Sequence, residues 1–217
     1  MNALAEHLPE TRTPLFPSVL CAIVDPGEDA ETVRQAAWLA GPGAAFDLVD
    51  ASAGAAAISE RCAGHDLLVL PAGPLARAVV PRSTIPVLVV RASPGTDGPG
   101  SVLIAVDETP EAHAAACTGA RLAARDGAHV AVVAAPEHDE LHRRALAEHL
   151  ATVERISSRR PLVLDEYGSP ATAVVVAATS LEASLVVIGS RRGRHPDSVS
   201  ASVAEQAPCS VLVLRTP

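Results

Sequence analysis

The stretch SVLIAVD (101–107) is the second occurrence of a pattern that the chain first shows as SVLCAIVD (18–25). Both are apolar runs, rich in β-branched residues, that end in Asp. Each copy closes on a similar run that ends in Arg, namely VLVVR (87–91) and VLVLR (211–215). Solenoid repeats have periods of only about 20–50 residues. The longer period of this chain therefore predicts two tandem copies of one domain.

The second copy alternates strand and helix signals throughout. Short apolar runs of the kind that form buried parallel strands lie at 102–107, 128–135, 161–167, 184–190 and 210–215. The intervening segments predict helices at about 109–125, 136–158, 170–182 and 198–206. Right-handed crossovers between such strands give a parallel sheet with helices on both faces. We therefore expect an α/β domain over residues 101–217.

The first copy is a shortened version of this plan. It predicts strands at 19–24, 44–49, 66–71 and 86–91, helices at about 28–40 and 54–62, and a turn-like segment at 74–85. The helix and strand of 137–167 have no counterpart. The Pro- and Gly-rich segment SPGTDGPG marks a linker. The expected organisation is an N-terminal extension (1–17), a truncated domain (18–92), the linker (93–100) and a full domain (101–217).

Composition excludes several functions. All 17 basic residues are arginines, so a lysine Schiff base and a lysine-containing phosphate loop are excluded. The net charge is −8 and aromatic residues make up 2% of the chain, which argues against nucleic-acid binding. Apolar runs fall short of the roughly 18–20 residues that span a membrane. The N-terminal segment carries acidic residues where a signal peptide would have its basic and apolar regions, so we expect a cytoplasmic protein.

Two sets of reactive side chains have simple structural interpretations. Cys21 and Cys209 lie in apolar strand-like runs and are expected to be small buried apolar groups, the alternative being a redox role. His138, His142 and His149 share one side of the predicted helix 136–158. They are expected to form the polar border of an amphipathic helix, the alternative being a metal site. The sequence has no GxSxG segment and no pair of carboxylates at catalytic spacing, so it gives no support to hydrolytic chemistry.

The second copy resembles the universal stress protein family over nearly all of residues 99–217. The resemblance rests on AVD (105–107), GSP (168–170), SLVVIGSRRG (184–193) and DSVSASVAEQAPCSVLVLR (197–215), in that order. The first copy is similar through its end strands and DLLVLPAG (66–73).

This resemblance implies two tandem, doubly wound, parallel-sheet domains of the adenine nucleotide alpha hydrolase-like type. Each sheet would have the order 3-2-1-4-5, and the first would lack strand 3 and its helix. Strand 3 lies at the edge, so its loss leaves a contiguous 2-1-4-5 sheet. The resemblance also implies pairing of fifth strands, here 86–91 with 210–215, within one chain. A homodimer and an unidentified protein partner are left open.

Nucleotide-binding members of that family carry Gly, two residues, Gly, nine residues and then Gly-Ser or Gly-Thr, with an Asp after the first strand. Glycines let the backbone approach phosphates, and a helix N-terminus presents N–H groups to the anion. The resemblance places a site for ATP or AMP in the second domain, with no metal other than nucleotide-associated magnesium. Its expected residues are Asp107, Gly189, Ser190, Arg191, Gly193 and Ser198.

The match to this motif is partial. Arg192 stands at the second glycine, and Asp197 replaces the last one. Seven residues (190–196) precede Asp197 where the motif has twelve, so we expect a pocket too shallow for a triphosphate. Arginines of the loop are either phosphate ligands or solvated side chains. Asp107 and Ser198 are alternatively a turn cap and a helix N-cap.

The residues favour a non-catalytic stress-response sensor or interaction module over an enzyme. A ligand would order the loop 190–197 and so alter a surface that partners contact. The alternatives are a dimerisation scaffold without ligand and a slow ATP hydrolase at the same site. In the first copy only Asp25 and Gly73 remain of the motif, so that copy is expected to be structural.

Overall fold

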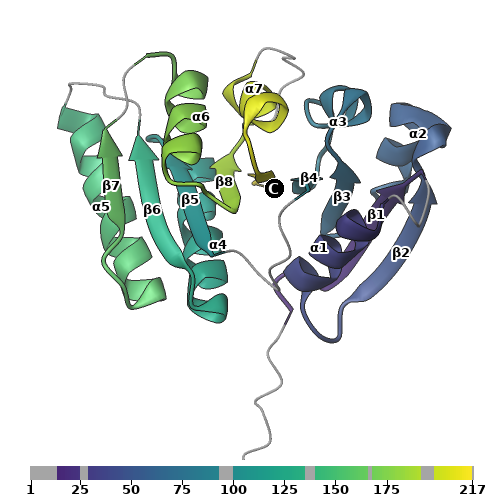
Figure 1. The fold of residues 1–217 in the computed structure, drawn as a ribbon, viewed down its shortest axis with the longest axis horizontal. Helices are drawn as coiled ribbons and strands as arrows, with labels where there is room; N and C mark the ends of the chain where they lie inside the picture. Colours follow the sequence, from purple (N-terminus) through teal and green to yellow (C-terminus); the bar gives the residue numbers. More distant parts are fainter. Residues whose placement is uncertain are drawn as a thin grey trace, which may run out of the picture.

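The computed structural model describes residues 14–24, 29–92, 100–134, 140–165, 168–191 and 198–216, without the side chain of Leu141. These residues form one α/β unit built on a single nine-stranded sheet of order β2-β1-β3-β4-β9-β8-β5-β6-β7 (Figure 1). All neighbouring strands are parallel except β4 and β9, which pair antiparallel. Helices cover both faces of the sheet.

The second half contains the five strands and four helices that the sequence predicts. Its elements are β5 (Ser101–Val106), α4 (Pro110–Asp126), β6 (His129–Ala134), α5 (Glu140–Ser157), β7 (Leu162–Asp165), α6 (Pro170–Ser180), β8 (Leu185–Gly189), α7 (Val199–Gln206) and β9 (Ser210–Leu214). Within this half the strand order is β7-β6-β5-β8-β9, the 3-2-1-4-5 arrangement. Helices α4, α6 and α7 begin at the N-caps Thr109, Ser169 and Ser198, whose hydroxyls each accept a backbone N–H.

The first half contains four strands in the order β2-β1-β3-β4. Its elements are β1 (Ser18–Ile23), α1 (Ala30–Ala40), β2 (Ala45–Asp50), η1 (Ala51–Ala53), α2 (Gly54–Arg61), β3 (Leu67–Pro71), α3 (Pro74–Val79) and β4 (Val87–Val90). Between β2 and β3 every residue is described, and only η1 and α2 connect them. The chain therefore passes directly from its second strand to the equivalent of a fourth strand.

The segment 74–85, expected to be turn-like, begins with a helix. Pro74 occupies the first turn of α3, where a missing N–H costs nothing. Ala76 and Val79 are buried against the sheet. At six residues α3 is too short to show helical periodicity clearly in the sequence, and tertiary packing rather than propensity stabilises it.

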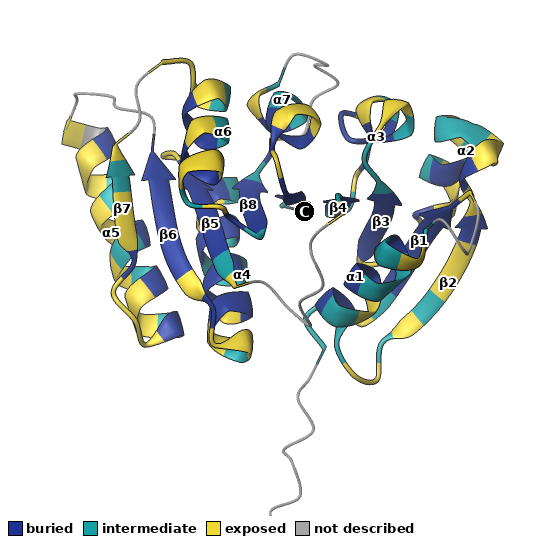
Figure 2. Ribbon diagram, in the orientation of Figure 1, coloured by how far each residue is buried: buried dark blue, intermediate teal, exposed yellow. Residues whose placement is uncertain are grey.

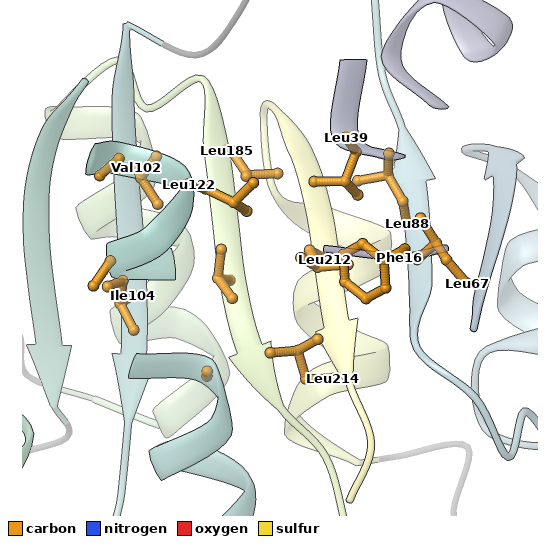
Figure 3. Close-up of a cluster of buried hydrophobic side chains, with 14 of the residues drawn as sticks. Phe16, Leu39, Leu67, Leu88, Val102, Ile104, Leu122, Leu185, Leu212 and Leu214 are labelled. Atoms are coloured by element: carbon orange, nitrogen blue, oxygen red, sulfur yellow. The ribbon is translucent and has the colours of Figure 1, made fainter. Parts of the chain in front are cut away.

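Two apolar clusters fill the molecule, one on each face of the sheet. One cluster includes residues of α1, α4 and α5, and the other includes residues of α2, α3, α6 and α7. Figure 3 shows the first cluster continuing from Ile104 and Leu185 through Leu212 to Leu88 and Phe16. Because each cluster crosses from one half to the other, the halves share a core. Phe16, placed by the sequence in an N-terminal extension, is part of it at 7% exposure.

The seam between the halves is the antiparallel pair β4 and β9. Leu88 lies opposite Leu212, with Val87 opposite Val213 and Val89 opposite Val211. This register is symmetric about the Leu88–Leu212 pair, as a local twofold axis requires.

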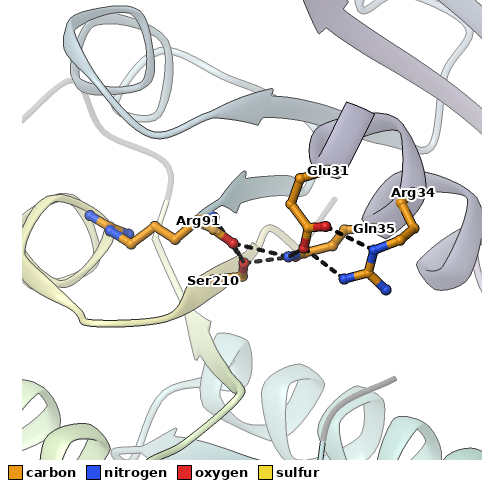
Figure 4. Close-up of polar contacts among 5 residues, drawn as sticks. All are labelled: Glu31, Arg34, Gln35, Arg91 and Ser210. Carbon is orange, nitrogen blue, oxygen red and sulfur yellow. Dashed lines mark hydrogen bonds and ion pairs between the residues drawn. The ribbon is translucent and has the colours of Figure 1, made fainter. Parts of the chain in front are cut away.

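Polar side chains link the halves beside the seam (Figure 4). The Ser210 hydroxyl donates to Gln35 Oε1 at 2.7 Å and accepts from Arg91 N at 3.0 Å. Gln35 Nε2 donates to the Arg91 carbonyl at 3.0 Å and to Glu31 Oε1 at 2.6 Å. Helix α1 of the first half is thus bonded to the strand that closes the second half.

The arginine that ends each copy reaches into the other half. Arg91 donates to the carbonyls of Ala204 at 2.8 Å and Glu205 at 2.6 Å, in the last turn of α7. Arg215 donates to the carbonyl of Val80, which caps α3. Burial lowers the pKa of both guanidinium groups. These arginines therefore donate hydrogen bonds across the seam to backbone carbonyls at helix C-termini, which have no partner within their own helix.

Candidate functional site

A pocket of about 240 Å³ opens at the carboxyl ends of β5 and β8. These parallel strands are neighbours, but the helices that follow them cover opposite faces, because α4 belongs to one apolar cluster and α7 to the other. In open α/β sheets this switch in direction leaves a crevice that ligands use. Its described lining residues are Ala105, Val106, Asp107, Glu108, Ala112, Val133, His142, Pro170, Val174, Ile188, Gly189, Arg191 and Val199.

Asp107 lines the pocket and also holds the turn into α4. Its Oδ1 accepts from Thr109 N at 2.9 Å and from the Thr109 hydroxyl, and Thr109 then caps α4. The backbone carbonyl of Asp107 accepts from His149 Nε2 at 2.9 Å. The turn-capping interpretation of Asp107 is therefore confirmed, while its carboxylate still lies on the pocket wall.

Gly189 ends β8 at a point of very close packing. A Cβ there would lie 2.4 Å from the carbonyl carbon of Glu111, 2.5 Å from its oxygen and 2.7 Å from Ala112 N. These are backbone atoms, so no rotamer change relieves the overlap. A glycine is therefore required by the approach of α4 to β8, whether or not a phosphate binds nearby.

Ser190 is buried and turned away from the described pocket. Its hydroxyl accepts from Ser200 Oγ at 2.7 Å and from Arg215 Nη1 at 2.6 Å. Arg215 Nη1 also donates to the carbonyl of Arg191 at 2.9 Å. Ser190 thus anchors the start of the loop after β8 to the closing strand, which positions the neighbouring residues rather than presenting a ligand.

Ser198 is the N-cap of α7, with its hydroxyl accepting from Ala201 N at 3.3 Å. It also lies 3.3 Å from Ser200 Oγ. The N-cap interpretation of Ser198 is confirmed. Gly193, Arg192, Asp197 and the remaining arginine and histidine of the loop lie outside the described residues.

Besides Asp107, three polar side chains give the described pocket its charge pattern. Arg191 is exposed and lines it on one side, and Glu108 follows Asp107 on the other. His142 from α5 is 6% exposed, with Nδ1 3.4 Å from Glu108 Oε2. Glu108 and His142 were not predicted from the sequence as pocket residues. Two features of the sequence could have indicated them. Glu108 directly follows Asp107, and His142 lies on the side of the long helix that faces the core.

His149 is buried as well, so the interpretation of His142 and His149 as a polar helix border is wrong. Its Nε2 bonds to the carbonyl of Asp107, and its ring lies 5.9 Å from that of His113 on α4. The inward side of α5 carries these imidazoles because each has a partner on α4 or the turn before it. Among the described residues, no group of three His, Cys, Asp or Glu side chains is arranged to hold a metal ion, and His138 lies outside them.

The cysteines are free thiols, and three of them are buried. Burial raises the pKa of Cys21 to about 12 and those of Cys62 and Cys209 to about 11. The expected burial of Cys21 and Cys209 is confirmed. Their protonated thiols act as small apolar groups in the core.

A family model described as "Universal stress protein family" matches residues 100–215. The chain belongs to the universal stress protein family. Among solved structures, a universal stress protein from Archaeoglobus fulgidus is 17% identical with a TM-score of 0.64, covering 88% of this chain and 76% of that one. A protein from Pseudomonas aeruginosa described as a universal stress protein is 18% identical with a TM-score of 0.66, covering 93% and 94%.

A third solved structure is a universal stress protein in complex with cAMP. It is 22% identical with a TM-score of 0.50, and it covers 55% of this chain and 99% of that chain. These likenesses establish the α/β fold of the family. No curated protein matches the chain in sequence. None of the helices within the described parts of the chain has the length and apolar character needed to cross a bilayer.

Proposed function

We propose that the second half binds an adenine nucleotide in the pocket between β5 and β8, and that this universal stress protein is a non-catalytic cytoplasmic sensor or interaction module. The observation that carries the proposal is the pocket itself. It lies at the switch point of the sheet and brings Asp107, Gly189 and Arg191 together. The family neighbour in complex with cAMP supports the same ligand class.

The lining suits the parts of a nucleotide. Val106, Val133 and Ile188 offer apolar walls to a purine ring. The carboxylate of Asp107 is an acceptor for ribose hydroxyls, as acidic residues are in other dinucleotide and nucleotide sites. The guanidinium of Arg191 is a charge-assisted donor for a phosphate.

The size of the pocket favours a small nucleotide. Sites for drug-sized ligands usually measure about 300–1,000 Å³, and the pocket bounded by the described residues measures about 240 Å³. Together with the shortened loop, this favours AMP or cAMP over ATP. Magnesium would enter only with a longer phosphate chain.

The contacts of Arg215 suggest how binding is transmitted. Arg215 bonds to the carbonyl of Arg191 at the pocket rim and to Val80 in the first half. A ligand held by Arg191 would fix this link and favour one arrangement of the loop, of which residues 192–197 lie outside the described part. The output would be a surface for a protein partner.

The test is titration calorimetry with AMP, cAMP and Mg-ATP. We expect AMP or cAMP to bind at least tenfold more tightly than Mg-ATP. Arg191→Ala should weaken binding at least tenfold, because it removes the phosphate donor. The matched control is Arg77→Ala, an exposed arginine of α3 that lines no part of this pocket and is expected to leave binding unchanged. An absence of heat with all three nucleotides at millimolar concentration would contradict the proposal.

The second candidate function is a scaffold without ligand. It is favoured by the structural tasks of the predicted site residues: Asp107 holds a turn, Gly189 admits α4, Ser190 anchors a loop and Ser198 caps α7. The calorimetry above separates the two candidates, since a scaffold gives no heat with any nucleotide while retaining its fold.

A further inference from the structure

A second cavity, of about 280 Å³, lies over the seam between the halves. It opens between α3 of the first half and α7 of the second, which lie side by side and both carry exposed residues (Figure 2). The residues that line it are Gly73, Pro74, Ala76, Arg77, Val80, Arg91, Ala201, Ala204 and Glu205. No described residue lines both this cavity and the pocket between β5 and β8, so the two are separate sites.

The arginines that end the two copies have unequal surroundings at the seam. Arg215 is 8% exposed, and its Nη1 donates to the Ser190 hydroxyl and the Arg191 carbonyl of its own half. Arg91 is half-buried. Within the described part of the chain, its guanidinium donates to carbonyls of the second half alone, at Cys209, Ala204 and Glu205. The first half therefore supplies no such acceptor to its own arginine.

A missing hydroxyl accounts for this difference. Ala72 takes the place of Ser190, since each donates its backbone N–H to the last residue of the neighbouring strand, at 2.8 and 2.9 Å. The next residue, Gly73, has a φ of +146°, and a Cβ built on it would meet nothing within 4 Å beyond its chain neighbours. Open space therefore remains beside Arg91 where the second half has a hydroxyl beside Arg215.

The cavity carries more positive than negative charge. Arg77 and Glu205 form an ion pair between the two helices at its exposed end, with side chains that are 68% and 43% exposed. Arg91 adds a second guanidinium. The walls between these groups are small and apolar, formed by Ala76, Val80, Ala201 and Ala204. Guanidinium groups are good partners for carboxylates, so this lining fits a carboxylate on a short apolar chain.

We propose that the seam cavity binds a small monocarboxylate with a short apolar chain. The carboxylate pairs with Arg77 in place of Glu205, with Arg91 as the second cation of the site. The apolar chain lies between Ala76 of α3 and Ala201 of α7. Because the ligand contacts both halves, its binding stabilises their association. The proposal does not depend on nucleotide binding.

Titration of the full chain with sodium butyrate, followed by proton–nitrogen correlation NMR spectra, tests the site. We expect the amide signals of Gly73 and Ala204 to shift and to saturate. Acetate should bind more weakly, by up to about fourfold for each methylene that butyrate buries. Butanol, which has the chain without the charge, should give no saturating shift, and sodium chloride at the same concentration controls for ionic strength.

The two members of the ion pair should respond in opposite directions. Arg77→Gln should weaken butyrate binding at least fivefold, because it removes the guanidinium that holds the carboxylate. Glu205→Gln should strengthen binding, because Glu205 then no longer competes for Arg77. The matched control is Arg82→Gln, an exposed arginine just beyond α3 that does not line the cavity, and it should leave binding unchanged.

A second pair of variants tests the apolar walls. Ala201→Leu fills the cavity from α7 and should abolish the shifts. Ser202→Leu, at a neighbouring half-buried position that does not line the cavity, should preserve them.

Three results would overturn the proposal. The first is the absence of saturating shifts with butyrate up to tens of millimolar in the unmodified chain. The second is equal affinity for acetate and butyrate, which indicates an adventitious ion only, held by exposed arginines. The third is weaker binding in Glu205→Gln, which shows that Glu205 holds the ligand rather than competing with it.

Discussion

The two halves differ by one helix and one edge strand, yet they share a sheet and two apolar clusters. Both keep the central strands: β1 aligns with β5, β3 with β8 and β4 with β9. The first half omits only what lies beyond β2 at the edge. A parallel sheet of this order therefore tolerates loss at its rim, because no remaining strand loses both neighbours.

The halves also differ at the switch point of the sheet. Pro71 of β3 occupies the position that Gly189 occupies in β8, since Pro71 pairs with Val90 as Gly189 pairs with Leu214. At Gly189 the first turn of α4 approaches the strand so closely that no Cβ fits. The backbone of the sheet is therefore duplicated, whereas the close approach beside the pocket belongs to the second half.

The largest effect is expected from Gly189→Ala. The new Cβ meets backbone atoms of Glu111 and Ala112, so strand and helix must separate. We expect a loss of about 3 kcal/mol in the free energy of unfolding, measured by urea denaturation. Pro71→Ala is the matched change in the first half and should cost less than about 1 kcal/mol. Equal losses in the two variants would contradict the difference between the halves.

A smaller effect is expected from the two seam arginines. Arg215→Met leaves the buried acceptors at Ser190, Arg191 and Val80 without their donor and should cost about 2 kcal/mol. Arg91→Met is its symmetry mate, is more exposed, and should cost about 1 kcal/mol. Urea denaturation measures both.

Nucleotide titration separates the roles of the two arginines. Only Arg215 touches the loop beside the pocket, so only Arg215→Met should also weaken nucleotide binding. An equal loss of affinity in Arg91→Met would show that seam stability, rather than loop anchoring, controls the pocket.

The smallest effect concerns thiol reactivity. Each unit by which burial raises a thiol pKa reduces the thiolate fraction about tenfold at a given pH. At pH 8 iodoacetamide should therefore label the half-buried Cys117 first, and Cys21, Cys62 and Cys209 much more slowly. Mass spectrometry of the native protein counts and locates the labels. Rapid labelling of Cys21 or Cys62, but not Cys209, would show that the first half opens more readily.

The same pKa shifts predict how stability depends on pH. The folded state keeps these thiols protonated above their ordinary pKa of 9.0, while the unfolded state releases the protons. The stability contributed by the raised pKa values is therefore fully present below pH 9 and is lost as the pH rises towards 11–12. Unfolding by urea at pH 8 and pH 10 checks the sign.

Much of the fold could be predicted because its strands and helix starts depend on patterns of neighbouring residues in the sequence. Apolar runs such as 102–107 and 210–215 became strands, and Pro and Ser or Thr marked the starts of α4, α6 and α7. Comparison of the two copies in the sequence showed that the first lacks one helix and one strand of the second. Helix α3 was missed because six residues carry too little periodicity.

The site was less predictable because its contacts join residues far apart in sequence. The sequence located Asp107, Gly189 and Arg191 at one pocket. It could not show that Gly189 faces the backbone of α4, that Ser190 points to Arg215, or that His142 turns inward to Glu108. Each of these depends on which helix crosses which strand end, and no local pattern encodes that.

The antiparallel pairing of β4 with β9 has an evolutionary consequence. Two identical chains that associate through the same strand receive every substitution twice, so neither can change without the other. Here both strands belong to one polypeptide, and each side of the local twofold axis accumulates mutations separately. One side is thereby free to lose an edge while the other keeps a pocket, and because the two are tethered, dilution does not separate them. The difference between the two halves is therefore encoded in the amino-acid sequence and does not require a ligand.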